Sequence, residues 1–169
     1  MKIRSFIRKF FVFCFCALFF NSLQAQLYTG GNAGIDYANG LYIDLAPLVG
    51  YRYKIFDTGV SPFVSYMKKN NIEESVVYGG RYYVQLHILR DLLVHAEIEG
   101  INNKMQYYLP DGALATKREW RLALPIGAGY SRRIAGNIGV HTLILYDLLL
   151  PKDSPIENPM IRAGVTYNF

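Results

Sequence analysis

The last ten residues of the chain, 160–169, constrain the fold more than any other segment. Every second side chain there is apolar or aromatic, namely Ile161, Ala163, Val165, Tyr167 and Phe169. Alternation with a period of two is typical of a β-strand whose two faces meet different surroundings. The segment therefore predicts a strand with one apolar face that runs to the carboxy-terminal phenylalanine.

The first 25 residues predict a different role, because they carry the three parts of a secretory signal peptide. An apolar run at 10–20 is followed by a short polar segment that ends on the small residue Ala25. Four cations precede the run: Lys2, Arg4, Arg8 and Lys9. We expect a signal peptide at 1–25, with cleavage before Gln26, and one domain at 26–169. The apolar run is too short for a transmembrane helix, which needs about 20 residues.

Charge and cysteine content exclude several classes of function for residues 26–169. The whole chain has a formal charge of +5, but four of its 18 lysines and arginines lie in 1–25 and none of its 13 acidic residues does. The mature segment is therefore close to neutral, and we expect no nucleic-acid partner. Both cysteines, Cys14 and Cys16, also lie in the signal. No thiol is left for a disulfide, a metal site or a nucleophile, and we expect no cofactor.

Eight segments of residues 26–169 alternate by twos and predict eight antiparallel strands. They are 28–37, 41–53, 59–67, 76–87, 92–103, 118–131, 137–148 and 160–169. The connections at 54–58, 88–91 and 132–136 are tight, whereas those at 68–75, 104–117 and 149–159 are long and polar. Short turns at one end and long loops at the other are typical of small barrels that cross a membrane.

Parity along these segments separates an apolar face from a polar face. The polar face carries the predicted charge network of the interior: Asp44, Arg81, Glu97, Glu99, Glu119, Arg121 and Arg162. The apolar face carries aromatic residues near both strand ends: Tyr51, Tyr53, Tyr66, Tyr78, Trp120, Tyr130, Tyr146, Tyr167 and Phe169. Two aromatic girdles are typical of a membrane protein, whereas a soluble barrel would have an apolar interior and a charged exterior. We therefore predict an all-β protein, an eight-stranded antiparallel up-and-down transmembrane β-barrel.

Four stretches carry a resemblance to a known group: APLVGYRY at 46–53, YGGRYYVQLHILRDLLVHAEIEG at 78–100, PIGAGYSRRIAGNIGV at 125–140 and IRAGVTYNF at 161–169. With them the chain resembles the small outer-membrane barrels of OmpA/OmpX type, and in particular the porin-like barrel proteins of Bacteroidetes. The resemblance implies the outer membrane of a Gram-negative bacterium as the location. It also implies contact with outer-membrane lipid and lipopolysaccharide, and recognition of the carboxy-terminal strand by the barrel assembly machinery.

The tight connection at 88–91 allows one pairing to be predicted in detail. If it centres on Asp91, the facing pairs are Gln85 with Glu97, Tyr83 with Glu99, and His87 with His95. Arg81 then lies diagonal to Glu99. Two facing histidines without an obvious carboxylate or thiol ligand are a weak metal signal, so we expect no metal site.

Three functions stay open at this point. The first is a non-enzymatic structural or interaction protein of the envelope, or an accessory subunit of an outer-membrane complex, with a filled lumen; eight strands leave an interior just wide enough for side chains. The second is a narrow porin-like channel for small solutes. The third is a lipid-modifying enzyme, but the chain has no His-x-Ser pair and its histidines are predicted to point inward.

The longest outer loop, at 104–117, is the place where we expect a partner to bind. It carries Tyr107, Tyr108 and Leu109 ahead of a Pro-Asp-Gly turn. Exposed aromatic residues on a loop suit contact with an outer-membrane protein or a glycan. The alternative is that these residues extend the aromatic girdle at the barrel rim.

Overall fold

The computed structural model describes residues 25–36, 40–69, 75–108, 114–150 and 158–169. These ranges contain nine β-strands: β1 (Ala25–Asp36), β2 (Gly40–Tyr53), β3 (Phe56–Lys69), β4 (Ser75–His87), β5 (Leu92–Tyr108), β6 (Leu114–Ala123), β7 (Pro125–Ala135), β8 (Ile138–Asp147) and β9 (Met160–Asn168). Within them there is no helix long and apolar enough to cross a membrane. The predicted signal peptide lies outside the described residues except for Ala25, the first residue of β1.

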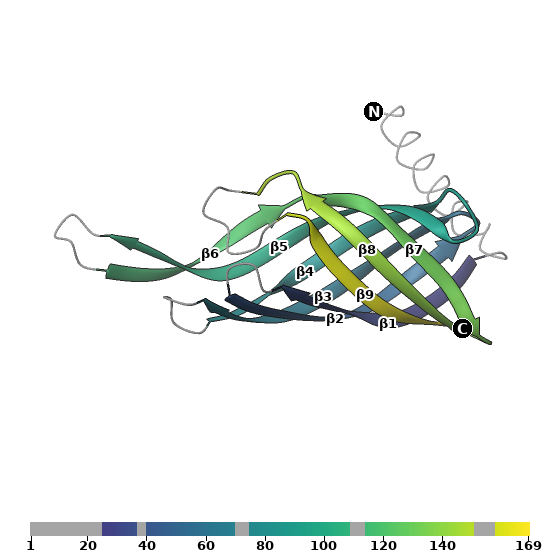
Figure 1. Cartoon of the computed structure of the whole chain (residues 1–169), viewed down its shortest axis with the longest axis horizontal. Helices are drawn as coiled ribbons and strands as arrows, with labels where there is room; N and C mark the ends of the chain where they lie inside the picture. The colour runs from purple at the N-terminus through teal and green to yellow at the C-terminus, as the bar shows by residue number, and fades with distance from the viewer. Residues whose placement is uncertain (1–24, 37–39, 70–74, 109–113, 151–157) are drawn as a thin grey trace, which may run out of the picture.

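The strands close into a barrel in which every pairing is antiparallel (Figure 1). The sheet runs in the order β4-β3-β2-β1-β9-β8-β7-β5-β6, and an additional pairing of β4 with β5 completes the ring. The described strands thus form a closed ring, and closure is the condition for strands to span a lipid bilayer.

β6 and β7 together form one strand of the barrel. Both pair with β5, and the register is continuous, because Glu99 faces Ala123 on β6 while Ala96 faces Ile126 on β7. Leu124 interrupts the ladder just before Pro125, which has no N–H to donate. The Leu124 amide instead donates to Asp147 Oδ1 at 2.9 Å. The prediction of an eight-stranded up-and-down barrel is therefore confirmed.

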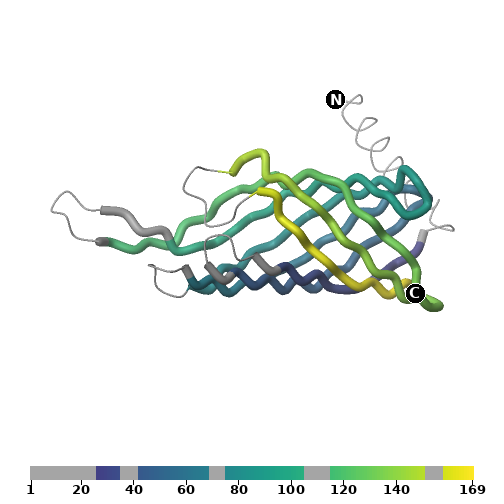
Figure 2. The backbone as a smooth tube through the Cα atoms, in the orientation of Figure 1, coloured from purple at the N-terminus to yellow at the C-terminus, as the bar shows by residue number. Residues whose placement is uncertain are grey.

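The hairpin of β5 and β6 is longer than predicted. The sequence predicted strands at 92–103 and 118–131, but the ladder continues to the pair of Tyr108 and Leu114. Figure 1 shows the hairpin extending beyond the rest of the barrel. The tight turns lie at the opposite end, where Lys54–Ile55 and Gly136–Asn137 each join two strands, and Figure 2 shows the carboxy terminus there too.

The two faces of the barrel have opposite character. Along β8, Ile144 and Tyr146 are exposed, whereas His141 and Asp147 are buried. The same alternation on the other strands leaves aliphatic and aromatic side chains on the outside and charged side chains inside. This arrangement is the reverse of a soluble barrel and suits an apolar solvent around the wall.

The predicted girdle residues all lie on the outer face. Tyr66 is half-buried, and the other eight are exposed: Tyr51, Tyr53, Tyr78, Trp120, Tyr130, Tyr146, Tyr167 and Phe169. The rings of Tyr78 and Trp120 pack edge to face with their centroids 6.2 Å apart, and those of Tyr167 and Phe169 do so at 5.3 Å. Their placement at a membrane interface stays a prediction.

Candidate functional site

Arg81 is the first of two buried arginines around which the interior is organised. Strand register places Arg81 of β4 opposite Glu99 of β5, and Asp44 of β2 opposite Ser65 of β3. The Arg81 guanidinium donates from both terminal nitrogens to the two Asp44 oxygens, each at 2.9 Å, and its Nε is paired with Glu99 Oε1. A bidentate arginine–carboxylate pair is among the strongest polar contacts in proteins.

Arg162 of β9 is the second arginine. Its Nη2 donates to Glu99 Oε1 at 2.8 Å, and its Nη1 is paired with Glu97 Oε1. Glu99 is therefore shared between two guanidinium groups. Arg162 faces Gly34 across the β1–β9 ladder, so no side chain on β1 competes for the space beside it.

We call these five residues, Asp44, Arg81, Glu97, Glu99 and Arg162, the central charge cluster. None is more than 5% exposed. Three carboxylates meet two guanidinium groups, and His95 Nε2 lies 3.1 Å from Glu97 Oε2 as a further polar partner. Charges this deeply buried require such pairing, because each costs several kcal/mol of solvation.

Polar neighbours hold the central charge cluster in place from further strands. Ser65 Oγ donates to Asp44 Oδ1 at 2.7 Å and accepts a hydrogen bond from the Tyr42 hydroxyl at 2.9 Å. Gln85 Nε2 lies 2.9 Å from His95 Nδ1. The Arg81 guanidinium also lies over the ring of Phe63, with its Cζ atom 4.1 Å from the ring centroid. The cluster and these neighbours together cross-link β2, β3, β4, β5 and β9 through the lumen.

Two tyrosines fill the lumen between the central charge cluster and the turn end. The hydroxyls of Tyr28 and Tyr83 lie 2.9 Å apart, and the Tyr83 ring stacks on His95 at 5.8 Å. Gly50 and Gly59 face one another on β2 and β3, and their missing side chains leave room for both rings. The cavity beside them has a volume of about 20 Å³, which is space for about one water molecule.

A second ionic group, which the sequence did not predict, lies nearer the turns. Asp57 is fully buried and accepts hydrogen bonds from Arg52 Nη2 at 2.7 Å and from His87 Nε2 at 3.0 Å. Arg52 also donates to Asn168 at 3.3 Å. The sequence assigned Asp57 to the connection 54–58, but β3 begins at Phe56. The parity of Asp57 with the inward-facing Ser61 was the signal for it.

The prediction that Glu119 belongs to the interior network is wrong. Glu119 is exposed and forms an ion pair with Lys117 at 3.1 Å. Glu119 is at an alternating position that faces the lumen elsewhere along the strand. It lies, however, on the part of the β5–β6 hairpin that extends past the end of the barrel. Arg121, two residues closer to the barrel, is half-buried.

The predicted register of β4 and β5 is wrong by two residues. Gln85 faces His95 rather than Glu97, and His87 faces Leu93. The turn centres on Arg90 rather than Asp91, because the amides of Ile88 and Leu89 both donate to the Leu92 carbonyl, at 3.0 and 3.2 Å. The shift brings Arg81 directly opposite Glu99 instead of diagonal to it.

The sequence also led us to expect no metal site and a partner-binding loop. The described residues contain no group of three or more histidine, cysteine or acidic residues that could hold a metal ion. Tyr107 and Tyr108 are in β5, but their side chains, and Leu109 as a whole, lie outside the residues whose surroundings the structure describes. The partner-binding role of these three residues stays a prediction.

Comparison with known proteins finds similarity in structure only. No protein family and no characterised protein matches the sequence. Neisserial surface protein A is 14% identical with a TM-score of 0.50, and the match covers 86% of this chain and 96% of that one. The N-terminal β-barrel domain of Pseudomonas aeruginosa OprF is also 14% identical with a TM-score of 0.43, over 86% and 96%. A de novo designed transmembrane β-barrel is 15% identical with a TM-score of 0.42, over 85% and 95%.

The likeness to Neisserial surface protein A concerns the fold. The chain has the fold of the small eight-stranded outer-membrane barrels, as its resemblance to the OmpA/OmpX type implied. The narrower likeness to Bacteroidetes proteins stays a prediction.

Proposed function

We propose that this protein is a non-conducting, non-enzymatic barrel of the outer membrane that serves as a structural or interaction protein of the envelope, or as an accessory subunit of an outer-membrane complex. The observation that carries the proposal is the central charge cluster. Its side chains join four strands, β2, β4, β5 and β9, across the lumen, and Tyr28 and Tyr83 occupy the space between the cluster and the turn end. An ion that passed would have to separate these buried pairs, and each buried charge left without its partner costs several kcal/mol.

The apolar wall and the fold support a location in the outer membrane. We propose that outer-membrane lipid and lipopolysaccharide surround the exposed aliphatic and aromatic side chains, with the short turns facing the periplasm. The β5–β6 hairpin then projects outward as the place where another outer-membrane protein could bind.

The positions of the histidines support a non-enzymatic role. A lipid-modifying serine hydrolase would need a histidine beside its nucleophile on the lipid-facing rim. All three histidines of the sequence, His87, His95 and His141, lie on the inward face, where each contacts an interior side chain.

A solute-uptake assay tests the proposal against a channel. Liposomes that contain the folded protein should swell in an isotonic solution of a small sugar no faster than protein-free liposomes. Swelling that increases with the amount of folded protein would instead establish a channel for small solutes.

The carboxy-terminal strand should direct assembly of the barrel. Phe169 is 65% exposed on the outer wall, and its amide donates to the Leu27 carbonyl at 3.1 Å. We expect Phe169→Glu to lower the amount of folded barrel in the envelope several-fold, because a charge replaces the terminal aromatic group that resembles the assembly signal. Heat-modifiable gel mobility measures the folded fraction.

Phe169→Tyr is the matched control, since it keeps an aromatic ring at the same position and should assemble normally. Asn168 is no neutral comparison, because it is 5% exposed and hydrogen-bonded to Arg52 and to the Asn137 carbonyl. Equal yields from Phe169→Glu and Phe169→Tyr would contradict the proposed role of the terminal residue.

A further inference from the structure

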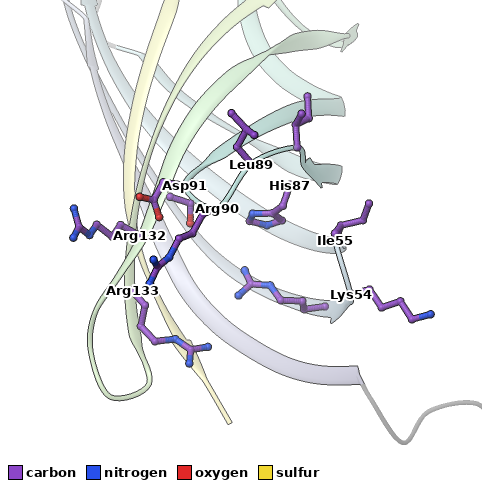
Figure 3. Close-up of a pocket in the computed structure, with 11 residues that line it drawn as sticks. Lys54, Ile55, His87, Leu89, Arg90, Asp91, Arg132 and Arg133 are labelled. Atoms are coloured by element: carbon purple, nitrogen blue, oxygen red, sulfur yellow. The ribbon is translucent and has the colours of Figure 1, made fainter.

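The turn end of the barrel contains a broad pocket that the proposed function does not use (Figure 3). Its volume is about 800 Å³. Its walls come from the end of β2, the turn at Lys54–Ile55, the turn at 88–91 and the end of β7. Figure 3 shows Lys54 on one side of the opening and Arg132 and Arg133 on the other, with Arg90 between them.

The lining of this pocket is strongly cationic. Five lysine and arginine side chains contribute to it, whereas Asp91 is its one acidic residue: the cations are Arg52, Lys54, Arg90, Arg132 and Arg133. Asp57, beneath the pocket, is fully buried and already paired with Arg52 and His87. The excess positive charge therefore has no internal counterpart in the residues that surround the pocket.

Arg90 and Arg133 stand out among these cations. Both are exposed, and neither side chain forms a hydrogen bond or ion pair with any residue that the structure describes. Arginine has a planar fork of donors that suits the oxygen atoms of a phosphate group. Two such groups at one pocket provide donors for a single anion.

Aliphatic side chains accompany the cations at every tight turn. Ile55 follows Lys54, Leu89 precedes Arg90, and Ile134 follows Arg133; these aliphatic residues are 59%, 61% and 62% exposed. Large aliphatic groups at turn tips are costly in water, whereas at a membrane surface they enter the acyl region while the neighbouring cations stay at the headgroups. Ile55, Ile88 and Leu89 also line the pocket itself.

We propose that this pocket binds the phosphate of an anionic phospholipid headgroup, with Arg90 and Arg133 as its principal ligands. A phosphodiester without a neighbouring cation matches the unpaired guanidinium groups, and its acyl chains match the exposed aliphatic residues beside them. The short turns place the pocket at the periplasmic leaflet. The site is independent of whether the barrel conducts, so a failure of either proposal leaves the other standing.

Native mass spectrometry of the folded barrel in a neutral detergent tests this site. The probes are dioctanoyl phosphatidylglycerol, which is anionic, and dioctanoyl phosphatidylcholine, in which choline neutralises the phosphate. We expect tighter binding of phosphatidylglycerol, and a loss of roughly thirtyfold in its affinity in the double variant Arg90→Gln, Arg133→Gln, since each of the two surface cations contributes about 1 kcal/mol to binding an anionic lipid.

Two further variants make the result specific. Lys104→Gln with Lys117→Gln removes the same charge at the opposite end of the barrel and should leave the affinity unchanged. Arg90→Lys with Arg133→Lys keeps the charge and should recover part of it. All these side chains are exposed, so the folded barrel should form in each case.

The source of the phosphate is decided by competition. If millimolar inorganic phosphate leaves phosphatidylglycerol binding unchanged, the result supports the lipid; if it displaces the lipid, the result supports the phosphate site with free phosphate as its ligand. Equal affinity for the two lipids, or an equal loss in the Lys104 and Lys117 variant, would overturn the proposal.

Discussion

Replacing Arg162 with methionine should lower the free energy of unfolding by about 3–5 kcal/mol. Arg162 is 5% exposed and contacts both Glu97 and Glu99. Among the described residues, its loss leaves Arg81 and His95 as the partners of the two buried carboxylates, and Arg81 is also bound to Asp44. Urea unfolding of the barrel in detergent, followed by heat-modifiable mobility, measures the change.

Two controls distinguish the loss of ion pairs from the general effect of replacing an arginine with methionine. Arg133→Met removes an arginine that is exposed and should change the free energy of unfolding by less than about 0.5 kcal/mol. Glu99→Gln should cost a few kcal/mol alone, but adding it to Arg162→Met should cost less than the sum, because the two residues are in contact. An Arg162→Met barrel as stable as the parent would show that the central charge cluster does not hold the strands together.

Replacing Gly59 with valine should destabilise the barrel by about 3 kcal/mol. A Cβ atom at Gly59 would meet the Tyr83 hydroxyl and the Val49 carbonyl, and the carbonyl belongs to the backbone of β2 and cannot rotate away. Displacing Tyr83 also breaks its contacts with Tyr28 and His95. The same urea measurement detects the loss.

Gly80→Val is the matched control for Gly59→Val. Gly80 is exposed on β4, and a Cβ atom there would have no neighbour within 4 Å. This substitution should leave stability within about 0.5 kcal/mol of the parent, since it adds a β-branched residue to an open wall. Equal costs at the two positions would mean that Gly59 does not make room for the tyrosines.

The sequence was sufficient to predict the number of strands and the two faces, because both depend on local alternation. Along β8 and β9 every second residue faces the lumen, and the period of two allows no other arrangement of those side chains. Arg81, Glu97, Glu99 and Arg162 could therefore be assigned to the interior before their contacts were known.

The errors arose because alternation gives no information about where a strand ends or on which residue a turn is centred. A turn at 88–91 can centre on Arg90 or on Asp91 with the same pattern in the strands, and only the hydrogen bonds to Leu92 decide between them. Alternation also continues past a barrel rim without a break, so it could not show that Glu119 lies beyond the rim. Asp57 has the same parity as the inward-facing Ser61, but it was assigned to a turn because nothing in the sequence marks the start of β3 at Phe56.

Single-channel recording across a planar lipid bilayer tests the filled interior most directly. The unmodified protein, inserted as the folded barrel, should show no stable conductance above that of the bare bilayer, if the central charge cluster and the two tyrosines block the lumen as proposed. Steady open-channel currents from the unmodified protein would show that the charged interior conducts ions and does not simply fill the lumen.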